Sequence, residues 1–322
     1  MARLTYVLPF KSGGGEDLAG LAAYLRSLAR IVDVIVVDGS DPPEFERHRE
    51  LWGDAVAHVP PRDSLSYANG KVDGVVTGVE LARTEAVVVA DEDVRYDVAG
   101  LQRMGELLER FDLVRPQNYF DPRPWHALWD TGRILLNRAL AADYPGTLGV
   151  RRSLFVEAGG YDGDVMFENL EMIRTIEEAG GTSVAPLGLY VRRIPPPTGA
   201  FLSQRTRQAY DDLAQPWRLS TFAAVLPAAV AALRRRPLLV PAVGAAIVVL
   251  AEAGRRKAGG TRVFPFAGSL MAPLWVLERA ACVWVALAHR VRGGVPYRGR
   301  RIRMAANSRR TIRRRLRARS GR

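Results

Sequence analysis

Ala86-Val87-Val88-Val89-Ala90-Asp91-Glu92-Asp93 is an apolar, β-branched run that stops at three carboxylates. Such a run is typical of a strand buried on both faces of a parallel sheet. Open α/β sheets bind ligands at the carboxyl ends of their strands, and two aspartates separated by one residue can hold a hard divalent cation against a diphosphate. The stretch therefore indicates metal-assisted handling of a nucleotide. The alternative interpretation is a solvated acidic turn before a helix that begins near Asp97.

The first half of the chain repeats this rhythm of strand, loop and helix. Residues 34–37 form a second apolar run, which ends at Asp38-Gly39-Ser40-Asp41. Further strands are predicted at residues 4–8, 55–59 and 113–116, and helices at 17–29, 71–82, 98–110 and 169–179. The alternation indicates right-handed βαβ crossovers and a mainly parallel sheet flanked by helices. Residues 118–145 are irregular and aromatic, and are interpreted as an acceptor groove or as ordinary core packing.

Composition limits the class of protein. A chain of 322 residues with 48% hydrophobic residues is long enough for one large or two ordinary domains with a substantial core, which excludes a disordered chain. Cys282 is the single cysteine, so an intramolecular disulfide and a cysteine-based zinc cluster are excluded. The apolar core of residues 1–9 is too short for a signal peptide, and we expect this part of the chain in the cytoplasm.

After residue 217 the chain becomes strongly apolar, in segments 219–233, 237–251 and 263–288. At about 1.5 Å per residue, the middle segment barely reaches across a hydrocarbon core of about 30 Å. Two spans would place Arg255-Arg256-Lys257 on the far side, against the tendency of Lys and Arg to stay cytoplasmic. We therefore favour helices that lie in the membrane interface, with a two-span hairpin next and a buried soluble helical domain as the alternative.

The formal charge of +12 is concentrated in the C-terminal part, where residues 300–322 are dense in arginine and show little hydrophobic periodicity after Met304. Beside apolar segments, the natural partner of this tail is an anionic membrane surface, to which each basic residue contributes about 1 kcal/mol. Nucleic acid is the alternative suggested by charge alone. Since no fingerprint of a nucleic-acid module accompanies the arginines, we expect no nucleic-acid partner.

Four motifs, taken in order, resemble the family-2 glycosyltransferases of the GT-A fold, particularly bacterial membrane-associated members that glycosylate lipids or build polysaccharide. The resemblance covers residues 3–218. Val36-Val37-Asp38-Gly39-Ser40 resembles the nucleotide-binding strand end of the family, and Asp91-Glu92-Asp93 resembles its metal-binding acids. Phe167-Glu168-Asn169-Leu170-Glu171 is similar to the catalytic acids, and Gln204-Arg205-Thr206-Arg207 is similar to the glutamine-arginine motif. The resemblance implies a GT-A domain at 1–218, apolar membrane-associated helices at 219–292 and a basic tail at 293–322.

The resemblance also implies roles on the donor side. Mg²⁺ or Mn²⁺ bridging the two phosphates stabilises the nucleoside diphosphate as it leaves, with Asp93 as its first ligand. Asp91 then contacts the ribose, the sugar or the metal, while Asp38 and Pro9 frame the nucleoside. Lys71 meets a phosphate or the ribose, or else is a solvated lysine that opens a helix. The residues Gln204, Arg205 and Arg207 grip the diphosphate, or else belong to a basic juxtamembrane helix.

The catalytic base is where this chain departs from the family pattern. The family places Glu-Asp at this motif, whereas the second position here is Asn169, which accepts no proton at neutral pH. Glu168 is therefore the first candidate for the base and Glu171 the second, with helix capping as the alternative role of both. Gln208 stands where the family has a tryptophan, which favours a single-sugar transferase over a processive polymer synthase.

These features predict an inverting, metal-dependent glycosyltransferase on the cytoplasmic face of the membrane. Its donor is a nucleotide sugar and its acceptor a lipid or lipid-linked molecule. A nucleotidyltransferase is the second hypothesis, and a membrane scaffold that lost its base at Asn169 is the third. The four histidines, His48, His58, His126 and His289, show no paired spacing of the kind that hydrolases use. Gly13-Gly14-Gly15 lacks the pattern of a phosphate-binding loop.

Overall fold

The computed structural model of the chain describes residues 3–141, 143–297 and 299–320. The chain divides into two compact units that are interleaved in sequence. Unit 1 comprises Met1–Pro116, Pro145–Val191 and Asn307–Arg322, and unit 2 comprises Gln117–Tyr144 and Arg192–Ala306. The domains expected from the sequence are consecutive ranges, and that division into functional parts stays a prediction.

Unit 1 is built around a mixed sheet with the strand order β3-β2-β1-β4-β8-β6-β9. The strands β3, β2, β1 and β4 pair in parallel, as do β6 and β9, whereas β8 is antiparallel to both its neighbours. The predicted fold class, a mainly parallel α/β sheet flanked by helices, is confirmed by this topology. The elements of unit 1 are β1 (Leu4–Phe10), α1 (Leu18–Leu28), β2 (Asp33–Asp38), α2 (Pro42–Trp52), η1 (Gly53–Ala55), β3 (Ala57–Val59), α3 (Gly70–Leu81), β4 (Ala86–Ala90), β5 (Val94–Arg95), α4 (Val98–Leu108), β6 (Leu113–Val114), β8 (Thr147–Arg151), α6 (Arg152–Glu157), α7 (Glu168–Glu178), β9 (Ser183–Val184) and α12 (Arg309–Ser320).

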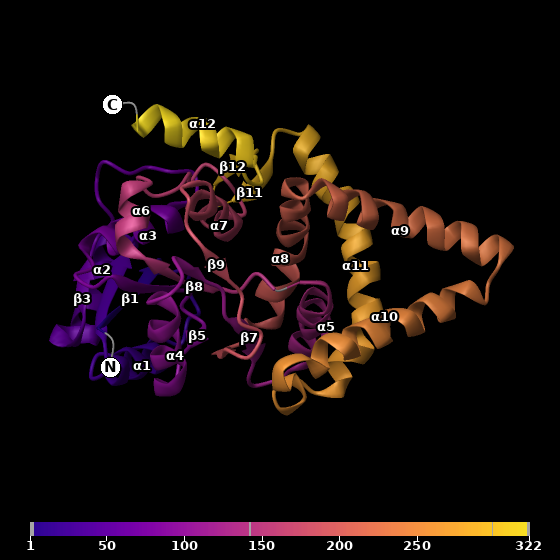
Figure 1. The fold of residues 1–322 in the computed structure, drawn as a ribbon, viewed down its shortest axis with the longest axis horizontal. Coiled ribbons are helices and arrows are strands. Elements are labelled where there is room, and N and C mark those ends of the chain that lie inside the picture. Colours follow the sequence, from indigo (N-terminus) through magenta and orange to yellow (C-terminus); the bar gives the residue numbers. More distant parts are fainter. Residues whose placement is uncertain (1–2, 142, 298, 321–322) are drawn as a thin grey trace. The chain divides into compact units, whose positions relative to one another are not determined.

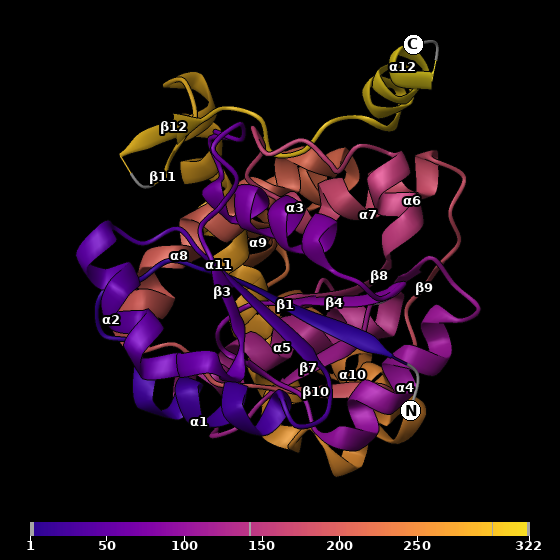
Figure 2. The ribbon, with the colours of Figure 1, turned by 90° about the vertical axis from the view of Figure 1, so that its left-hand side faces the viewer.

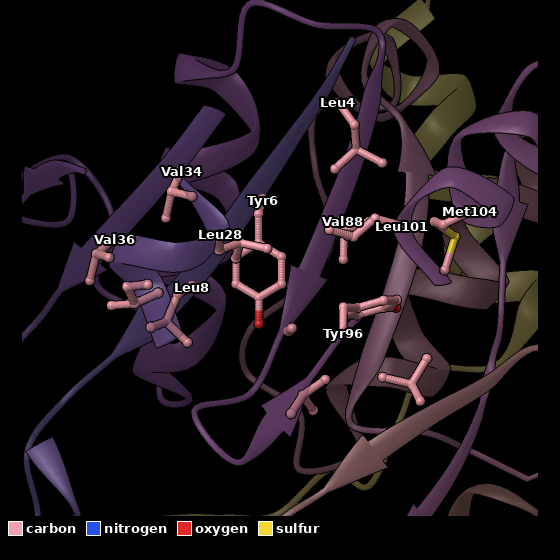
Figure 3. Packing of buried hydrophobic residues seen from close by; sticks show 14 of the residues in the cluster. Leu4, Tyr6, Leu8, Leu28, Val34, Val36, Val88, Tyr96, Leu101 and Met104 are labelled. Atoms are coloured by element: carbon pink, nitrogen blue, oxygen red, sulfur yellow. The ribbon is translucent and has the colours of Figure 1, made fainter. Parts of the chain in front are cut away.

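Helices cover both faces of this sheet, with α1 and α4 on one side and α3, α6 and α7 on the other (Figure 2). Alternate residues of each strand serve the two layers. Tyr6, Leu8 and Val88 pack with the cluster that includes residues of α1 and α4, as Figure 3 shows. On the other face α3 lies so close that a Cβ added at Gly78 would meet Val7 Cγ1 at 2.3 Å, and this contact explains a glycine inside the helix.

The sheet brings the predicted acidic motifs to one edge. β2 ends at Asp38, and β4 ends at Ala90, immediately before Asp91. Both strands run parallel to β1, which lies between them, so their carboxyl ends share an edge. The structure thereby confirms the strand ends expected from the apolar runs.

The segment at residues 118–145, whose sequence pattern is irregular, is largely regular in structure. It contains β7 (Gln117–Phe120) and a helix, α5 (Trp125–Leu140), in unit 2. Buried polar side chains, among them Asp130, Asn137 and Arg138, interrupt the hydrophobic period of this helix, so that the pattern did not reveal it. The residue at position 142 lies outside the described part of the chain.

Unit 2 is predominantly helical. Its further elements are α8 (Thr198–Tyr210), η2 (Asp211–Ala214), α9 (Pro216–Arg235), α10 (Leu239–Arg256), η3 (Lys257–Arg262), α11 (Phe266–Val291), β11 (Val295–Tyr297) and β12 (Arg300–Ile302), while β10 (Tyr190–Arg193) carries the chain from unit 1 into unit 2. Figure 1 shows α9 and α10 converging on the turn that joins them. In the described residues, α9 and α11 are long and apolar enough to cross a membrane by length and composition, and the apolar window of α9 is only 6% buried.

Candidate functional site

The Lys71 side chain links two of the predicted acidic motifs in unit 1. Its Nζ lies 2.5 Å from Asp91 Oδ1 and 2.6 Å from Glu168 Oε1. Asp91 follows β4 at the edge where that parallel strand ends, Lys71 lies in the first turn of α3, and Glu168 opens α7. Three residues predicted separately from the sequence therefore meet in one place, and the interpretation of Lys71 as a solvated lysine is wrong for this structure.

Two loops hold this arrangement by hydrogen bonds between segments distant in sequence. The side chain of Asn69 caps α3 by accepting from the backbone amide of Lys71, and the backbone amide of Asn69 donates to Gly163 O at 2.9 Å. The amide of Ala68 donates to Asp164 Oδ1 at 2.9 Å. The N-terminus of α3 is thus bonded to the loop that leads into α7, which places Lys71 beside Glu168.

Glu168 has the surroundings expected of a proton acceptor. The residue is 8% exposed, and its Oε1 binds Lys71, whereas its Oε2 is buried without a hydrogen-bond partner among the described residues. Burial raises the pKa of Glu168 above the ordinary glutamate range, Lys71 lowers it, and the nearby charge of Asp91 raises it. A carboxylate whose pKa is raised takes up a proton more readily near neutral pH.

The charge on Lys71 is held by the same contacts. Burial by itself opposes the ammonium form, but Asp91 and Glu168 outweigh this, and the pKa of Lys71 is raised. The ammonium group is therefore a fixed positive charge between two carboxylates.

Tyr161 is a site residue that the sequence analysis did not identify. It lies in the turn Gly159-Gly160-Tyr161-Asp162, is 4% exposed, and its hydroxyl has no hydrogen-bond partner within the described residues. Burial and the charges of Glu168 and Asp91 raise the pKa of this phenol, so the hydroxyl stays protonated beside the acids. Tyr161 stands out because its buried hydroxyl lies among charged groups without a partner in the described residues. This feature exists only in the folded chain, so the sequence could not reveal it.

Asp38 lies at the end of β2 and is 1% exposed. Its Oδ2 lies 2.7 Å from His48 Nδ1 and 3.1 Å from His58 Nε2, and its Oδ1 accepts from the amide of Ser40. Although burial opposes ionisation, these hydrogen bonds lower the pKa of Asp38 to about 2. The spacing of His48 and His58 in the sequence does not predict this pairing, because α2 carries one ring to Asp38 and β3 carries the other. Pro9 lies buried in β1 beside Val37 and packs against Gly74 of α3.

The acids predicted to bind a metal lie on the turn after β4. Asp91 and Asp93 are partly exposed and Glu92 is exposed. Among the described residues, no group of three or more His, Cys, Asp or Glu side chains is placed to hold a metal ion. The donor set still fits Mg²⁺ or Mn²⁺ in a nucleotide complex, because such cations combine a few carboxylate oxygens with phosphate oxygens and water. Lys71 contacts one oxygen of Asp91, and the metal-binding role of Asp91 and Asp93 stays a prediction.

Glu171 is engaged elsewhere. It is 1% exposed, and its two oxygens accept from the backbone amide and the side-chain amide of Asn307, at 2.7 and 2.9 Å. Burial raises the pKa of Glu171, while the two donors oppose that shift. Glu171 and Glu168 share the first turn of α7, yet Lys71 contacts Glu168 and Asn307 contacts Glu171.

The predicted diphosphate-gripping residues lie in unit 2, on α8. Arg205 is 6% exposed, and its guanidinium contacts Asp130 at 3.0 Å and Glu278 at 2.6 Å, which ties α8 to α5 and α11. Arg207 stacks over the ring of Tyr297, with 5.5 Å from Cζ to the ring centroid. Gln204 is half-buried. The donor-binding role of these three residues stays a prediction.

No family model matches the chain, and no curated protein sequence matches it. Among solved structures, it is similar to a mannosyltransferase from Pyrobaculum calidifontis in complex with GDP-Man and Mn²⁺, with 19% identity, 87% of this chain and 86% of that chain covered, and a TM-score of 0.49. It is also similar to glucosyl-3-phosphoglycerate synthase from Mycobacterium tuberculosis in complex with phosphoglyceric acid, with 17% identity, 65% and 78% coverage, and a TM-score of 0.44. Both TM-scores lie below 0.5, and both identities lie below 25%.

Proposed function

We propose that the chain is a metal-dependent, inverting glycosyltransferase of the GT-A fold and the family-2 type. It moves a sugar from a nucleotide-sugar donor to a lipid or lipid-linked acceptor. The observation that carries the proposal is the Lys71 bridge between Asp91, at the carboxyl end of a parallel strand, and Glu168, at the start of α7. The carboxyl end of a strand, where open α/β sheets bind ligands, and a buried carboxylate suited to accept a proton support this proposal by their contact with one lysine.

In the proposed reaction, Glu168 is the catalytic base. Its Oε2, buried and without a partner in the described part of the chain, accepts the proton of the acceptor hydroxyl. The acceptor oxygen attacks the anomeric carbon as the bond from that carbon to the diphosphate oxygen breaks. The nucleoside diphosphate leaves with the electron pair, and the proton remains on Glu168. Attack opposite the leaving group inverts the anomeric configuration, and Lys71 keeps Oε1 fixed throughout.

Asp93 and Asp91 are the residues that would hold Mg²⁺ or Mn²⁺. When bound there, the cation neutralises charge that develops on the leaving diphosphate. On the donor side we assign Asp38 and Pro9 to the nucleoside, and Gln204, Arg205 and Arg207 to the diphosphate. The hydrogen bonds of Asp38 to two histidines make it a rigid acceptor at the strand end.

Membrane association at the cytoplasmic face is the second part of the proposal. It is supported by large apolar side chains that α9, α10 and the turn between them leave exposed, including Leu233 at 58%, Leu238 at 83% and Val249 at 68%. Exposed apolar surface of this extent marks an interaction with protein or lipid. An acceptor with a lipid part would be presented at that surface, beside anionic headgroups that suit the arginine-rich tail.

The test is nucleotide release from UDP, GDP and dTDP sugars by the full chain in the presence of Mg²⁺ or Mn²⁺. We expect release with at least one donor, and a loss of at least 100-fold in Glu168→Gln. Glu157→Gln, an exposed substitution on α6, is the matched control and should behave as the wild-type chain. Absence of release with every donor contradicts the transferase and favours the scaffold. Pyrophosphate release from a nucleoside triphosphate and a sugar phosphate would favour the nucleotidyltransferase.

A further inference from the structure

The C-terminal segment that follows residue 306 returns to unit 1 and packs on α7. Asn307 is 5% exposed, and its side-chain amide donates both to Glu171 Oε1 at 2.9 Å and to Asp162 Oδ2 at 2.7 Å. Its backbone amide donates to Glu171 Oε2 at 2.7 Å. Arg174, one turn further along α7, donates to Asn307 O at 2.7 Å. A single residue therefore joins α7 to the turn that carries Tyr161.

The helix α12 continues this attachment. Arg313 lies 2.7 Å from Glu178 at the end of α7, and Arg315 lies 2.5 Å from Asp162. Arg319 donates to the carbonyls of Ala158 and Gly159 in the turn before Tyr161. Exposed ion pairs of this kind contribute little individually, about 0 to 1 kcal/mol. The buried contact of Asn307 is consequently the part of the attachment whose removal matters most.

Asn307 supplies hydrogen-bond donors to two acidic side chains, Glu171 and Asp162. Glu171 and Asp162 are both acidic, and the charge of Asp162 raises the pKa of Glu171. A buried carboxylate without donors is costly, and either takes up a proton or moves to another donor. The Tyr161 hydroxyl could serve as such a donor, because it is buried and has no partner among the described residues, and the charges of both Glu168 and Glu171 raise its pKa.

We propose that Asn307 is a positioning residue of the transfer reaction, which holds Glu171 and Asp162 immobile so that Glu168 alone in the first turn of α7 faces the acceptor. The inference rests on the proposed function. Because Glu168 and Glu171 are three residues apart on one helix, a change in the anchoring of Glu171 displaces the turn that orients Glu168 against Lys71. Asn307 acts through α7 and does not touch the donor acids, which follow β4.

A double-mutant cycle with Asn307→Asp and Glu171→Gln tests this role in the full chain. Asn307→Asp replaces the shared donor by a third carboxylate, and we expect kcat for nucleotide release to fall at least tenfold, while KM for the donor changes less than threefold. Adding Glu171→Gln restores a donor opposite position 307 and should recover part of kcat. The recovery is incomplete because Asp162 still faces the new carboxylate. Gln102→Glu, which adds the same charge on the exposed side of α4, is the matched control.

Rates are taken per folded molecule, with the thermal midpoint measured for each variant. A kcat for Asn307→Asp within twofold of the wild-type value overturns the inference, as does a double variant no faster than the single one. Glu171→Gln as inactive as Glu168→Gln also overturns it, because Glu171 would then be the base. If Asn307→Asp does not fold, Asn307→Ser, which keeps the backbone donor, carries the same comparison of kcat with KM. A wild-type chain without nucleotide release contradicts the proposed function instead.

Discussion

Lys71 on α3 and Glu168 on α7 form an ion pair, with 2.6 Å between Nζ and Oε1, across 97 positions of sequence. The side chain of Lys71 is 21% exposed and that of Glu168 is 10% exposed, so solvent screens the pair only in part. Its cation also binds Asp91, so that removal of Lys71 would leave two carboxylates facing each other.

Lys71→Met should lower kcat for nucleotide release at pH 7 by at least tenfold. Lys71 lowers the pKa of Glu168, which burial raises, so without the ammonium group this pKa rises further. A base acts only when it is deprotonated, and the acidic limb of the pH–rate profile should therefore move to higher pH. Lys11→Met, an exposed substitution in unit 1, serves as the control. An unshifted profile in Lys71→Met would show that Glu168 is not the group that titrates.

Removal of the divalent cation should abolish nucleotide release. A chelator is expected to reduce the rate at least 100-fold, and added Mn²⁺ or Mg²⁺ should restore it, because the leaving diphosphate needs a neutralising charge. Asp93→Ala should lose a similar factor and should not recover with metal. Asp63→Ala removes an exposed carboxylate of unit 1 and should keep the wild-type rate. Undiminished release in chelator would contradict the role of the acids after β4.

The sequence predicted those parts of unit 1 that depend on local pattern. The apolar runs at residues 4–8, 34–37 and 86–90 became β1, β2 and β4, and the acids at the ends of β2 and β4 lie where strand polarity places them. The pairing of side chains could not be predicted in this way. Asp38 is bonded to His48 and His58 because helix and strand packing brings both rings to it, and no spacing in the sequence records that.

The arginine-rich tail shows the same limit more clearly. Its charge predicted an external anionic partner, yet Arg309, Arg313 and Arg315 pair with acids of unit 1. The acids Glu177, Glu178 and Asp162 lie far away in sequence, so a count of charge in the tail cannot include them. A truncation after residue 217 would therefore remove a part of unit 1 together with the apolar helices, and substitutions in the full chain are the better test of membrane binding.

Asp38 should make folding stability depend on pH in the acid range. Its pKa is lowered from 3.8 to about 2, so it contributes stability that is fully present above pH 4 and is lost as the pH falls through 2. The shift corresponds to about 2 kcal/mol in the free energy of unfolding. Asp38→Asn should remove this contribution, so that the difference between the two proteins narrows as the pH falls from 4 to 2. Denaturant unfolding at several pH values measures it, and a constant difference would contradict the assignment.

The outward side of α12 should contact anionic lipid. Arg310, Arg314 and Arg317 recur at spacings of four and three residues, are exposed, and have no ion-pair partner in the described part of the chain, whereas Arg309, Arg313 and Arg315 face acids. Replacing these three outward arginines by Gln should reduce sedimentation of the full chain with vesicles of mixed phosphatidylcholine and phosphatidylserine. At about 1 kcal/mol for each arginine near the surface, the apparent affinity should fall on the order of 100-fold.

The control for this measurement removes the same charge elsewhere in unit 1. Arg30, Arg83 and Arg110 are exposed, and replacing them by Gln should leave binding to the same vesicles near the wild-type level. Vesicles of phosphatidylcholine alone separate the contribution of α12 from that of the apolar helices, since only the apolar contribution persists without anionic lipid. Equal losses in the two triple variants would mean that net charge, and not the outward side of α12, draws the protein to the membrane.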